Sequence, residues 1–176
     1  MLNYTSGKNG GVNVTGCGRV VFNSISEFTK GLAVSDTATV AVNPGMRPGN
    51  RTVTVNNGAT LEVAQSGTVN LYGGLTLADG AALGFNFTEK RTAPVLDVTG
   101  KTVTLGDNNS VTVKVSAADG IRPKGGAHVL TASDGAFADA KVTLASGAPN
   151  WVKGVSVVDG DIVLNVKSTG MVIIVK

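Results

Sequence analysis

The feature that most constrains the fold is a series of short, alternating apolar runs between Thr52 and Leu83. The segment reads TVTVNNGATLEVAQSGTVNLYGGLTLADGAAL, and Asn-Gly, Ser-Gly, Gly-Gly and Asp-Gly pairs interrupt it. Alternation with a period of two indicates strands that bury one face. The apolar pairs are Val53/Val55, Leu61/Val63, Val69/Leu71, Leu75/Leu77 and Leu83/Phe85. The segment therefore predicts very short strands that are separated by tight, glycine-containing corners.

The spacing of these strands bears on how they pair. In an antiparallel protein each hairpin pairs consecutive strands, whereas a solenoid pairs each strand with the one a full coil later. Three steps along the series lead from Val53 to Leu75, which is 22 residues and within the length of one solenoid repeat. Short strands bury little as isolated hairpins. We therefore expect an all-β fold in the form of a parallel β-helix, with an antiparallel β-sandwich throughout as the alternative.

The composition fits a narrow interior and excludes two classes of partner. Hydrophobic residues make up 42% of the chain but aromatic residues only 5%, so the core must be built from small aliphatic side chains, which stack well in a solenoid. The net charge of +3 is spread out, and the densest basic cluster, Glu89-Lys90-Arg91, contains an acid. Nucleic-acid binding would need a basic stripe, and a membrane span about 18 apolar residues. We expect neither.

The chain is predicted to divide near residue 120. The alternation continues on both sides of the central segment, in the groups Val12/Val14, Val20/Phe22, Leu32/Val34, Val40/Val42, Leu96/Val98, Val103/Leu105 and Val111/Val113/Val115. We expect residues 1–120 to form β-helix coils that are truncated at the N-terminal end. The cut edge of the first coil predicts end-to-end self-association, or a frayed start before about Gly10, because an unpaired strand edge seeks a partner.

The segment from Ile121 onward has a different pattern. In VSVVDGDIVLNVK, the pair Asp159-Gly160 lies between two alternating runs and predicts a hairpin with a type I′ turn. The final MVIIVK predicts one more strand. A solenoid needs a cap at its open end. We therefore predict that residues 121–176 form a C-terminal antiparallel β cap, packed on the coils as one structural unit.

Two stretches resemble a known repeat. The segments GRVVFNSISEFTKGLAVSDTATVAVN and RTVTVNNGATLEVAQSGTV are similar to the autotransporter-associated β-strand repeat, with residues 23–31 as its corner and residues 56–61 (NNGATL) as the closest match. The resemblance covers residues 7–85 well and 86–120 loosely. It implies a right-handed, single-stranded parallel β-helix from the passenger of a bacterial surface or secreted protein. A conventional autotransporter continues into an outer-membrane barrel, and the sequence given ends at Lys176 before such strands.

The chain carries no recognisable catalytic, cofactor or metal motif. Sugar hydrolysis usually needs two carboxylates that face one groove, but the only closely spaced acids are Asp159 and Asp161 of the predicted hairpin. Turn chemistry accounts for the four aspartates that precede glycine. They are Asp79, Asp119, Asp134 and Asp159. His128 lacks a Gly-x-Ser-x-Gly elbow and is interpreted as a cap-strand residue. Cys17 is interpreted as a small buried hydrophobic residue.

Two aromatic residues remain as candidates for ligand contact. Trp151 and Tyr72 could stack on sugar rings, although Trp151 is better explained as packing the cap against the last coil. The predicted function is a structural stalk or passenger segment of a cell-surface or secreted bacterial protein, without catalysis or cofactors. The alternative is an adhesin or glycan-binding module whose partners are glycans or surface proteins. A polysaccharide-active enzyme is the third hypothesis.

Overall fold

The computed structural model describes residues 2–6, 11–22, 31–45 and 51–168. Within these ranges the protein is all-β and contains no helix, as the sequence predicts, and hence no helix of the length and apolarity that a membrane span requires. The strands are β1 (Leu2–Ser6), β2 (Val12–Phe22), β3 (Leu32–Val34), β4 (Thr37–Val42), β5 (Val53–Val55), β6 (Thr60–Val63), β7 (Gly67–Asn70), β8 (Leu75–Leu77), β9 (Ala82–Phe87), β10 (Pro94–Asp97), β11 (Val103–Leu105), β12 (Ser110–Ala117), β13 (Gly126–Val129), β14 (Thr131–Ala132), β15 (Lys141–Leu144), β16 (Val152–Val158) and β17 (Asp161–Val166).

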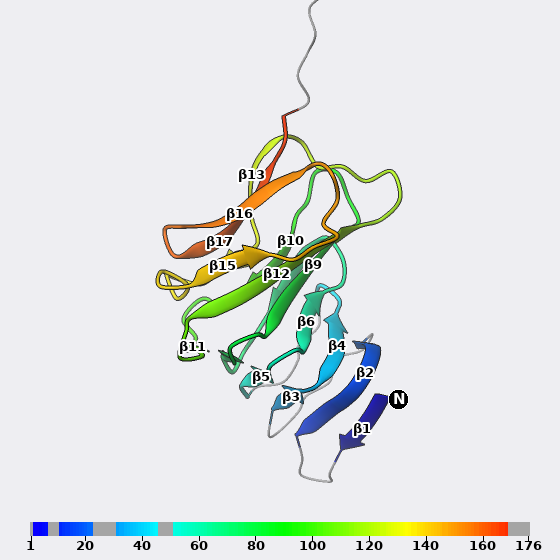
Figure 1. Cartoon of the computed structure of the whole chain (residues 1–176), viewed down its shortest axis with the longest axis vertical. Coiled ribbons are helices and arrows are strands. Elements are labelled where there is room, and N and C mark those ends of the chain that lie inside the picture. The colour runs from blue at the N-terminus through cyan, green and yellow to red at the C-terminus, as the bar shows by residue number, and fades with distance from the viewer. Residues whose placement is uncertain (1, 7–10, 23–30, 46–50, 169–176) are drawn as a thin grey trace, which may run out of the picture.

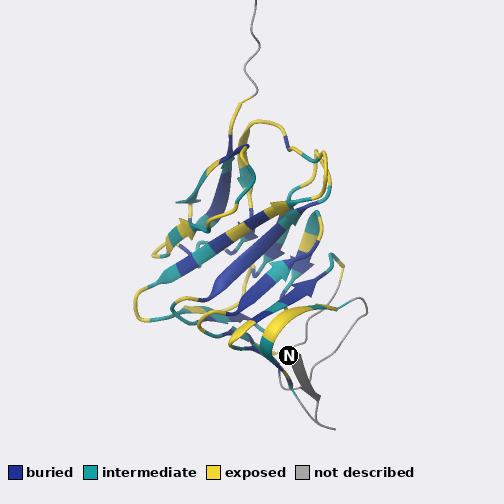
Figure 2. Ribbon diagram, turned by 45° about the vertical axis from the view of Figure 1, so that its right-hand side comes forward, coloured by how far each residue is buried: buried dark blue, intermediate teal, exposed yellow. Residues whose placement is uncertain are grey.

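Most strands belong to one large, mainly parallel sheet that curls around the core (Figures 1 and 2). Its order is β11-β8-β5-β3-β2-β4-β6-β9-β12-β15, with β1 added antiparallel to β2. Val12 faces Leu32, Leu32 faces Val53 and Val53 faces Leu75, so successive partners are 20, 21 and 22 residues apart. The antiparallel sandwich alternative is therefore wrong for these strands, because each pairs in parallel with a strand about one repeat away.

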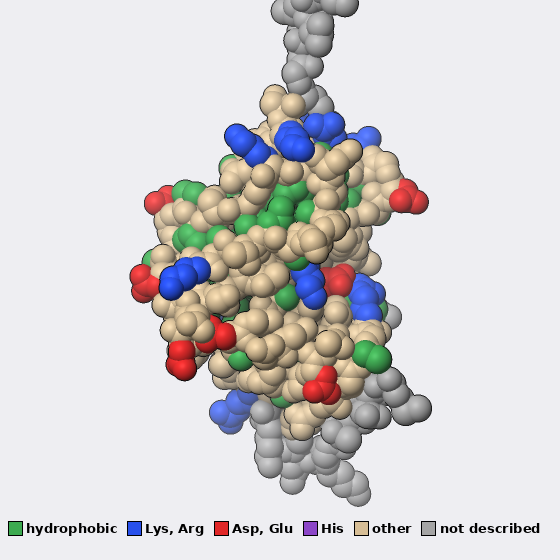
Figure 3. Space-filling view, in the orientation of Figure 1, with side chains coloured by type: hydrophobic (Ala, Val, Ile, Leu, Met, Phe, Trp, Pro, Cys, Tyr) green, Lys and Arg blue, Asp and Glu red, His purple; other side chains and the backbone are tan. Residues whose placement is uncertain are grey.

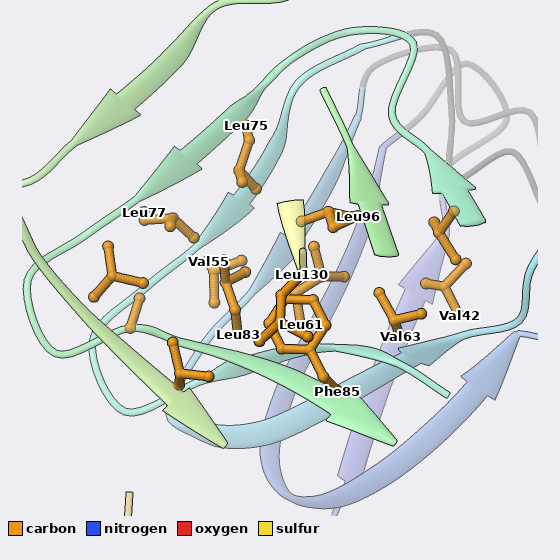
Figure 4. Close-up of a cluster of buried hydrophobic side chains, with 14 of the residues drawn as sticks. Val42, Val55, Leu61, Val63, Leu75, Leu77, Leu83, Phe85, Leu96 and Leu130 are labelled. Atoms are coloured by element: carbon orange, nitrogen blue, oxygen red, sulfur yellow. The ribbon is translucent and has the colours of Figure 1, made fainter. Parts of the chain in front are cut away.

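A second parallel sheet closes part of the core. Its order is β14-β10-β7, and Leu96 of β10 lies between Val69 and Thr131. Figure 4 shows side chains of the large sheet, among them Leu61 and Leu83, together with those of Leu96 and Leu130 in one apolar cluster. These four leucines are almost completely buried. The interior is a ladder of valine and leucine, which accounts for the low aromatic content.

The corners between strands bring backbones into close contact. Gly58 has a positive φ of 80°, and a Cβ atom there would lie 2.6 Å from the carbonyl oxygen of Asp36. Its backbone N–H donates to the carbonyl oxygen of Gly80, one corner further along, at 3.0 Å. Only glycine combines that backbone conformation with so close an approach. The Asn-Gly and Asp-Gly pairs of the sequence therefore mark corners that stack on one another.

The C-terminal segment contributes both kinds of pairing. Strands β13, β17 and β16 form a three-stranded antiparallel sheet, whereas β14 and β15 pair in parallel with β10 and β12. The predicted hairpin is confirmed, because Val158 pairs with Asp161 across a two-residue loop whose residues Asp159 and Gly160 have φ values of 50° and 77°. Figure 3 shows apolar side chains gathered on the surface over this part of the molecule. The domain boundary near residue 120 stays a prediction.

The N-terminal edge of the large sheet is partly covered. β1 pairs antiparallel with β2, with Leu2 opposite Gly16 and Ser6 opposite Val12. The expected frayed start is therefore wrong for residues 2–6, because a strand pairs there. Within the described residues, positions 17–22 of β2 have a strand partner on the β4 side only. Self-association through this edge stays a prediction, and the predicted corner at 23–30 and the MVIIVK strand lie outside the described residues.

Candidate functional site

Trp151 is a packing residue. Its side chain is 6% exposed, and its ring meets that of Phe87 edge-on, with the centroids 5.6 Å apart and the planes at 80°. This is the favourable T-shaped arrangement of two aromatic rings. Because Trp151 directly precedes β16 and Phe87 ends β9, the pair attaches the C-terminal segment to the coils. The interpretation of Trp151 as a packing residue is confirmed, and its use as a sugar-stacking platform is excluded by burial.

Tyr72 stays on the surface. It is 38% exposed and borders a shallow hollow of about 150 Å³, whose other lining residues include Asn70, Asp97 and Lys101. The carboxylate of Asp97 accepts a hydrogen bond from the backbone N–H of Thr99 at 2.9 Å. That bond holds the turn after β10. The structure thus leaves Tyr72 accessible beside groups that can hydrogen-bond, but it does not bring Tyr72 near Trp151 in any ring contact among the described residues.

His128 and Cys17 take different positions from one another. His128 lies on β13, as expected of a cap-strand residue, with its ring edge-on to Phe87 and its Nε2 atom 2.8 Å from the carbonyl oxygen of Lys124. The prediction for Cys17 is wrong, because its side chain is exposed. Gly16 and Gly18 flank it with φ values of 93° and 124°. The chain bends there as β2 passes from pairing with β3 to pairing with β4, which turns Cys17 outward.

The corner aspartates bind neighbouring corners. The carboxylate of Asp36 accepts from the backbone N–H of Gly16 at 2.8 Å, and that of Asp134 accepts from Gly100 at 2.9 Å. Asp79 accepts from both the backbone and the side-chain amide of Asn108. The turn interpretation of Asp79 and Asp134 is confirmed, but the sequence did not show that their partners lie one coil away. The described part of the chain contains no group of three or more acidic, histidine or cysteine side chains placed to hold a metal.

The most polar hollow lies on the outer face of the large sheet, and sequence reasoning missed it. We call it the Glu62 hollow. It has a volume of about 200 Å³ and is lined by Thr39, Thr60, Glu62, Gly84, Phe85, Lys114, Val115 and Ser116. Glu62, Gly84 and Lys114 are direct partners on the adjacent strands β6, β9 and β12. Figure 3 shows basic and acidic side chains close together midway along this face.

A bidentate ion pair forms one side of the Glu62 hollow. The guanidinium of Arg19 donates from Nε and Nη2 to the two carboxylate oxygens of Glu62, at 3.0 and 2.7 Å. Arg19 is on β2 and reaches across β4 to β6, over the small side chain of Ala41. The hydrogen bond from Glu62 raises the pKa of Arg19, so the pair stays charged at all ordinary pH values.

Lys114 forms the opposite side of the hollow. From β12 its ammonium reaches across β9 and donates to the hydroxyl of Thr60 on β6, at 2.8 Å. Gly84 of β9 makes this crossing possible, because a Cβ atom there would come within 3.0 Å of the Glu62 side chain. The available sequence signal was the charged residue in the outward positions of TLEV and VTVKV. A search for paired carboxylates overlooks a site in which a carboxylate faces a cation across a glycine.

The chain was compared with family models, with curated proteins and with solved structures, and none matches. The resemblance to the autotransporter-associated repeat therefore rests on the two sequence stretches alone. The function must be argued from the geometry described above.

Proposed function

We propose that this chain is a rigid structural segment of a right-handed parallel β-helix, carried by a surface-exposed or secreted bacterial protein and without catalytic activity. The observation that carries the proposal is the recurrence of three strand sets along the chain. They are β2/β4/β6/β9/β12/β15, β3/β5/β8/β11 and β7/β10/β14. Within each set, strands pair in parallel and in register. In this proposal every coil adds one strand to each set.

The stacking supports a mechanical role. Each coil is joined to the next by ladder hydrogen bonds, by the corner carboxylates and by a continuous aliphatic core. Local opening of one coil would expose the apolar faces of two neighbours, so such openings are costly. A segment of this kind resists proteases and holds its two ends apart. The surface location is supported by the resemblance of the NNGATL stretch to passenger repeats.

The coil pairing can be tested with engineered disulfides. Thr54 and Thr76 are half-buried partners on β5 and β8, 22 residues apart. Neighbouring parallel strands are about 4.8 Å apart, within the Cα separation that a disulfide spans. In a Cys17→Ser background, the Thr54→Cys/Thr76→Cys variant should oxidise to an internally cross-linked monomer. Thr54→Cys/Thr68→Cys is the matched control, and preferential cross-linking of the control pair would contradict the coil arrangement.

The mechanical role can be tested by limited proteolysis. The chain has 15 lysine and arginine residues, so trypsin has sites throughout it. We expect residues 51–168 to survive as one fragment long after an unfolded control is digested, because cleavage requires opening of the stack. Rapid cleavage between Val53 and Leu105 under native conditions would overturn the proposal. A polysaccharide-active enzyme has less support, since Asp36, Asp79 and Asp134 each accept backbone hydrogen bonds.

A further inference from the structure

We propose that the Glu62 hollow binds a carboxylate-bearing sugar residue of an acidic polysaccharide. This inference goes beyond the structural role, and it does not depend on the coil arrangement being right-handed or on surface location. It rests on the volume of the hollow, its charge and the hydroxyl groups around it.

The size of the hollow limits the ligand to a single ring. At about 200 Å³ it is smaller than the 300–1,000 Å³ of pockets that enclose drug-sized molecules. It is open to solvent on the outer face of the sheet, so a polymer can present one residue to it while the rest of the polymer lies along the surface. Gly84 forms the floor, and the absence of a side chain there leaves the space between Glu62 and Lys114.

The charge of the hollow favours a single negative charge on the ligand. Arg19 is already neutralised by its two bonds to Glu62. Lys114 has no such carboxylate partner: its ammonium donates to the Thr60 hydroxyl. An ammonium has three donors, so Lys114 retains the capacity to bind a ligand carboxylate. The three charged groups Arg19, Glu62 and Lys114 sum to one positive charge, which a monoanionic sugar balances.

The remaining lining groups match sugar hydroxyls. Thr39 supplies a hydroxyl at one end of the hollow, and Ser116 supplies one at the other while donating to the side-chain oxygen of Asn86 at 3.2 Å. Carboxylate oxygens each accept more than one hydrogen bond, so Glu62 can accept from a sugar hydroxyl while it holds Arg19. A simple inorganic anion would leave these hydroxyls and the Glu62 carboxylate unused. A hydroxylated carboxylate uses all of them.

The proposal is tested by titration calorimetry with oligogalacturonate as the probe and maltohexaose as the neutral control. We expect the wild-type protein to bind oligogalacturonate, to bind it more weakly as salt rises, and to bind maltohexaose far less. Lys114→Gln keeps the length of the side chain and removes its charge, and should weaken binding by about tenfold or more, as expected for loss of a charge-assisted hydrogen bond. Lys101→Gln, at an exposed lysine beside Tyr72, is the matched control and should bind like the wild type.

A second variant keeps the test decisive if Lys114→Gln alters folding. Ser116→Leu places an apolar side chain at an exposed rim position of the hollow and should also abolish binding, with an unchanged circular dichroism spectrum. No binding by the wild type at millimolar oligogalacturonate would overturn the proposal, as would equal binding of maltohexaose. Tighter binding of a sulfated glucan than of oligogalacturonate would also overturn it, and a loss at Lys101→Gln equal to that at Lys114→Gln would assign the binding to the Tyr72 hollow instead.

Discussion

The coils of residues 31–87 and the C-terminal segment of residues 121–168 build a core in two different ways. The coils stack valine and leucine side chains from strands about 21 residues apart, and their joints are glycine corners. The C-terminal segment folds locally into a hairpin and places Trp151, Phe137 and His128 near the last coils. Small aliphatic side chains fill identical layers, whereas large rings fill the irregular space where the layering ends. The comparison shows why one chain needs both kinds of residue.

The largest expected effects come from truncating one core residue in each region. Leu83→Ala and Trp151→Ala each remove a side chain that is at most 6% exposed, and each should cost about 3–5 kcal/mol of unfolding free energy. Urea unfolding followed by circular dichroism measures both. Trp151 is the only tryptophan, so its fluorescence reports the C-terminal segment in the wild type and in Leu83→Ala.

These two signals test whether the regions unfold together. The contact of Trp151 with Phe87, and the hydrogen bond from Leu130 to Ile162, join the C-terminal hairpin to the rest of the molecule. We therefore expect the fluorescence and circular dichroism midpoints to coincide, as in a two-state transition. A Trp151 transition at clearly lower urea would show that the C-terminal segment unfolds as a separate unit.

A pair of glycine substitutions gives the next largest difference. A Cβ atom at Gly73 would lie 2.1 Å from the backbone carbon of Arg51, whereas a Cβ atom at Gly154 would meet nothing within 4 Å. Gly73→Ala should cost about 3 kcal/mol, because backbone must move. Gly154→Ala should change stability by less than about 1 kcal/mol. Equal thermal midpoints for the two variants would contradict the close stacking of the coils.

A corner carboxylate is expected to have a smaller effect. Asp79→Ala removes the acceptor of the Asn108 backbone N–H and should cost about 1 kcal/mol. Asp119→Ala changes an exposed aspartate that also precedes glycine, and serves as the control. Chemical denaturation of both variants measures the difference. If Asp119→Ala proved as costly as Asp79→Ala, bonding between corners would not be the reason for the aspartates.

The smallest effect is expected for the ion pair on the outer face. The Arg19 and Glu62 side chains are 45% and 15% exposed, and such pairs contribute at most about 1 kcal/mol. Glu62→Gln should therefore lower stability by less than this amount, with the loss shrinking in high salt. The same variant should change oligogalacturonate binding more than it changes stability. A loss of several kcal/mol would mean that the pair is needed for folding.

The repeating strands could be predicted from the sequence because each one is written locally. Alternation at Val53/Val55 and Leu61/Val63 gives the strand and its buried face, and the glycine pairs give the corners. The turn at Asp159-Gly160 is equally local, since its backbone conformation depends on two residues. The all-β class, the parallel partners and the hairpin therefore follow from short-range patterns.

The outer-face hollow could not be predicted in the same way. Arg19 and Glu62 are 43 residues apart, and Lys114 and Thr60 are 54 residues apart. Their proximity depends on the register of five strands, and a shift of one residue in any of them would turn a side chain to the opposite face. The exposure of Cys17 was missed for a related reason. The alternation of β2 is interrupted at Gly16 and Gly18, so the pattern on one side does not extend to the other.

The lengthening of the coils toward the C-terminus has a consequence for how this molecule could be altered. Val40 pairs with Leu61 and Leu61 with Leu83, steps of 21 and 22 residues, but Leu83 pairs with Val113, 30 residues later. Most of the added length lies between Phe85 and Pro94, in an exposed corner that includes Glu89, Lys90 and Arg91. The strands on both sides keep their partners. This corner is therefore a natural insertion point, where a foreign peptide could be displayed on the rigid scaffold without disturbing any layer.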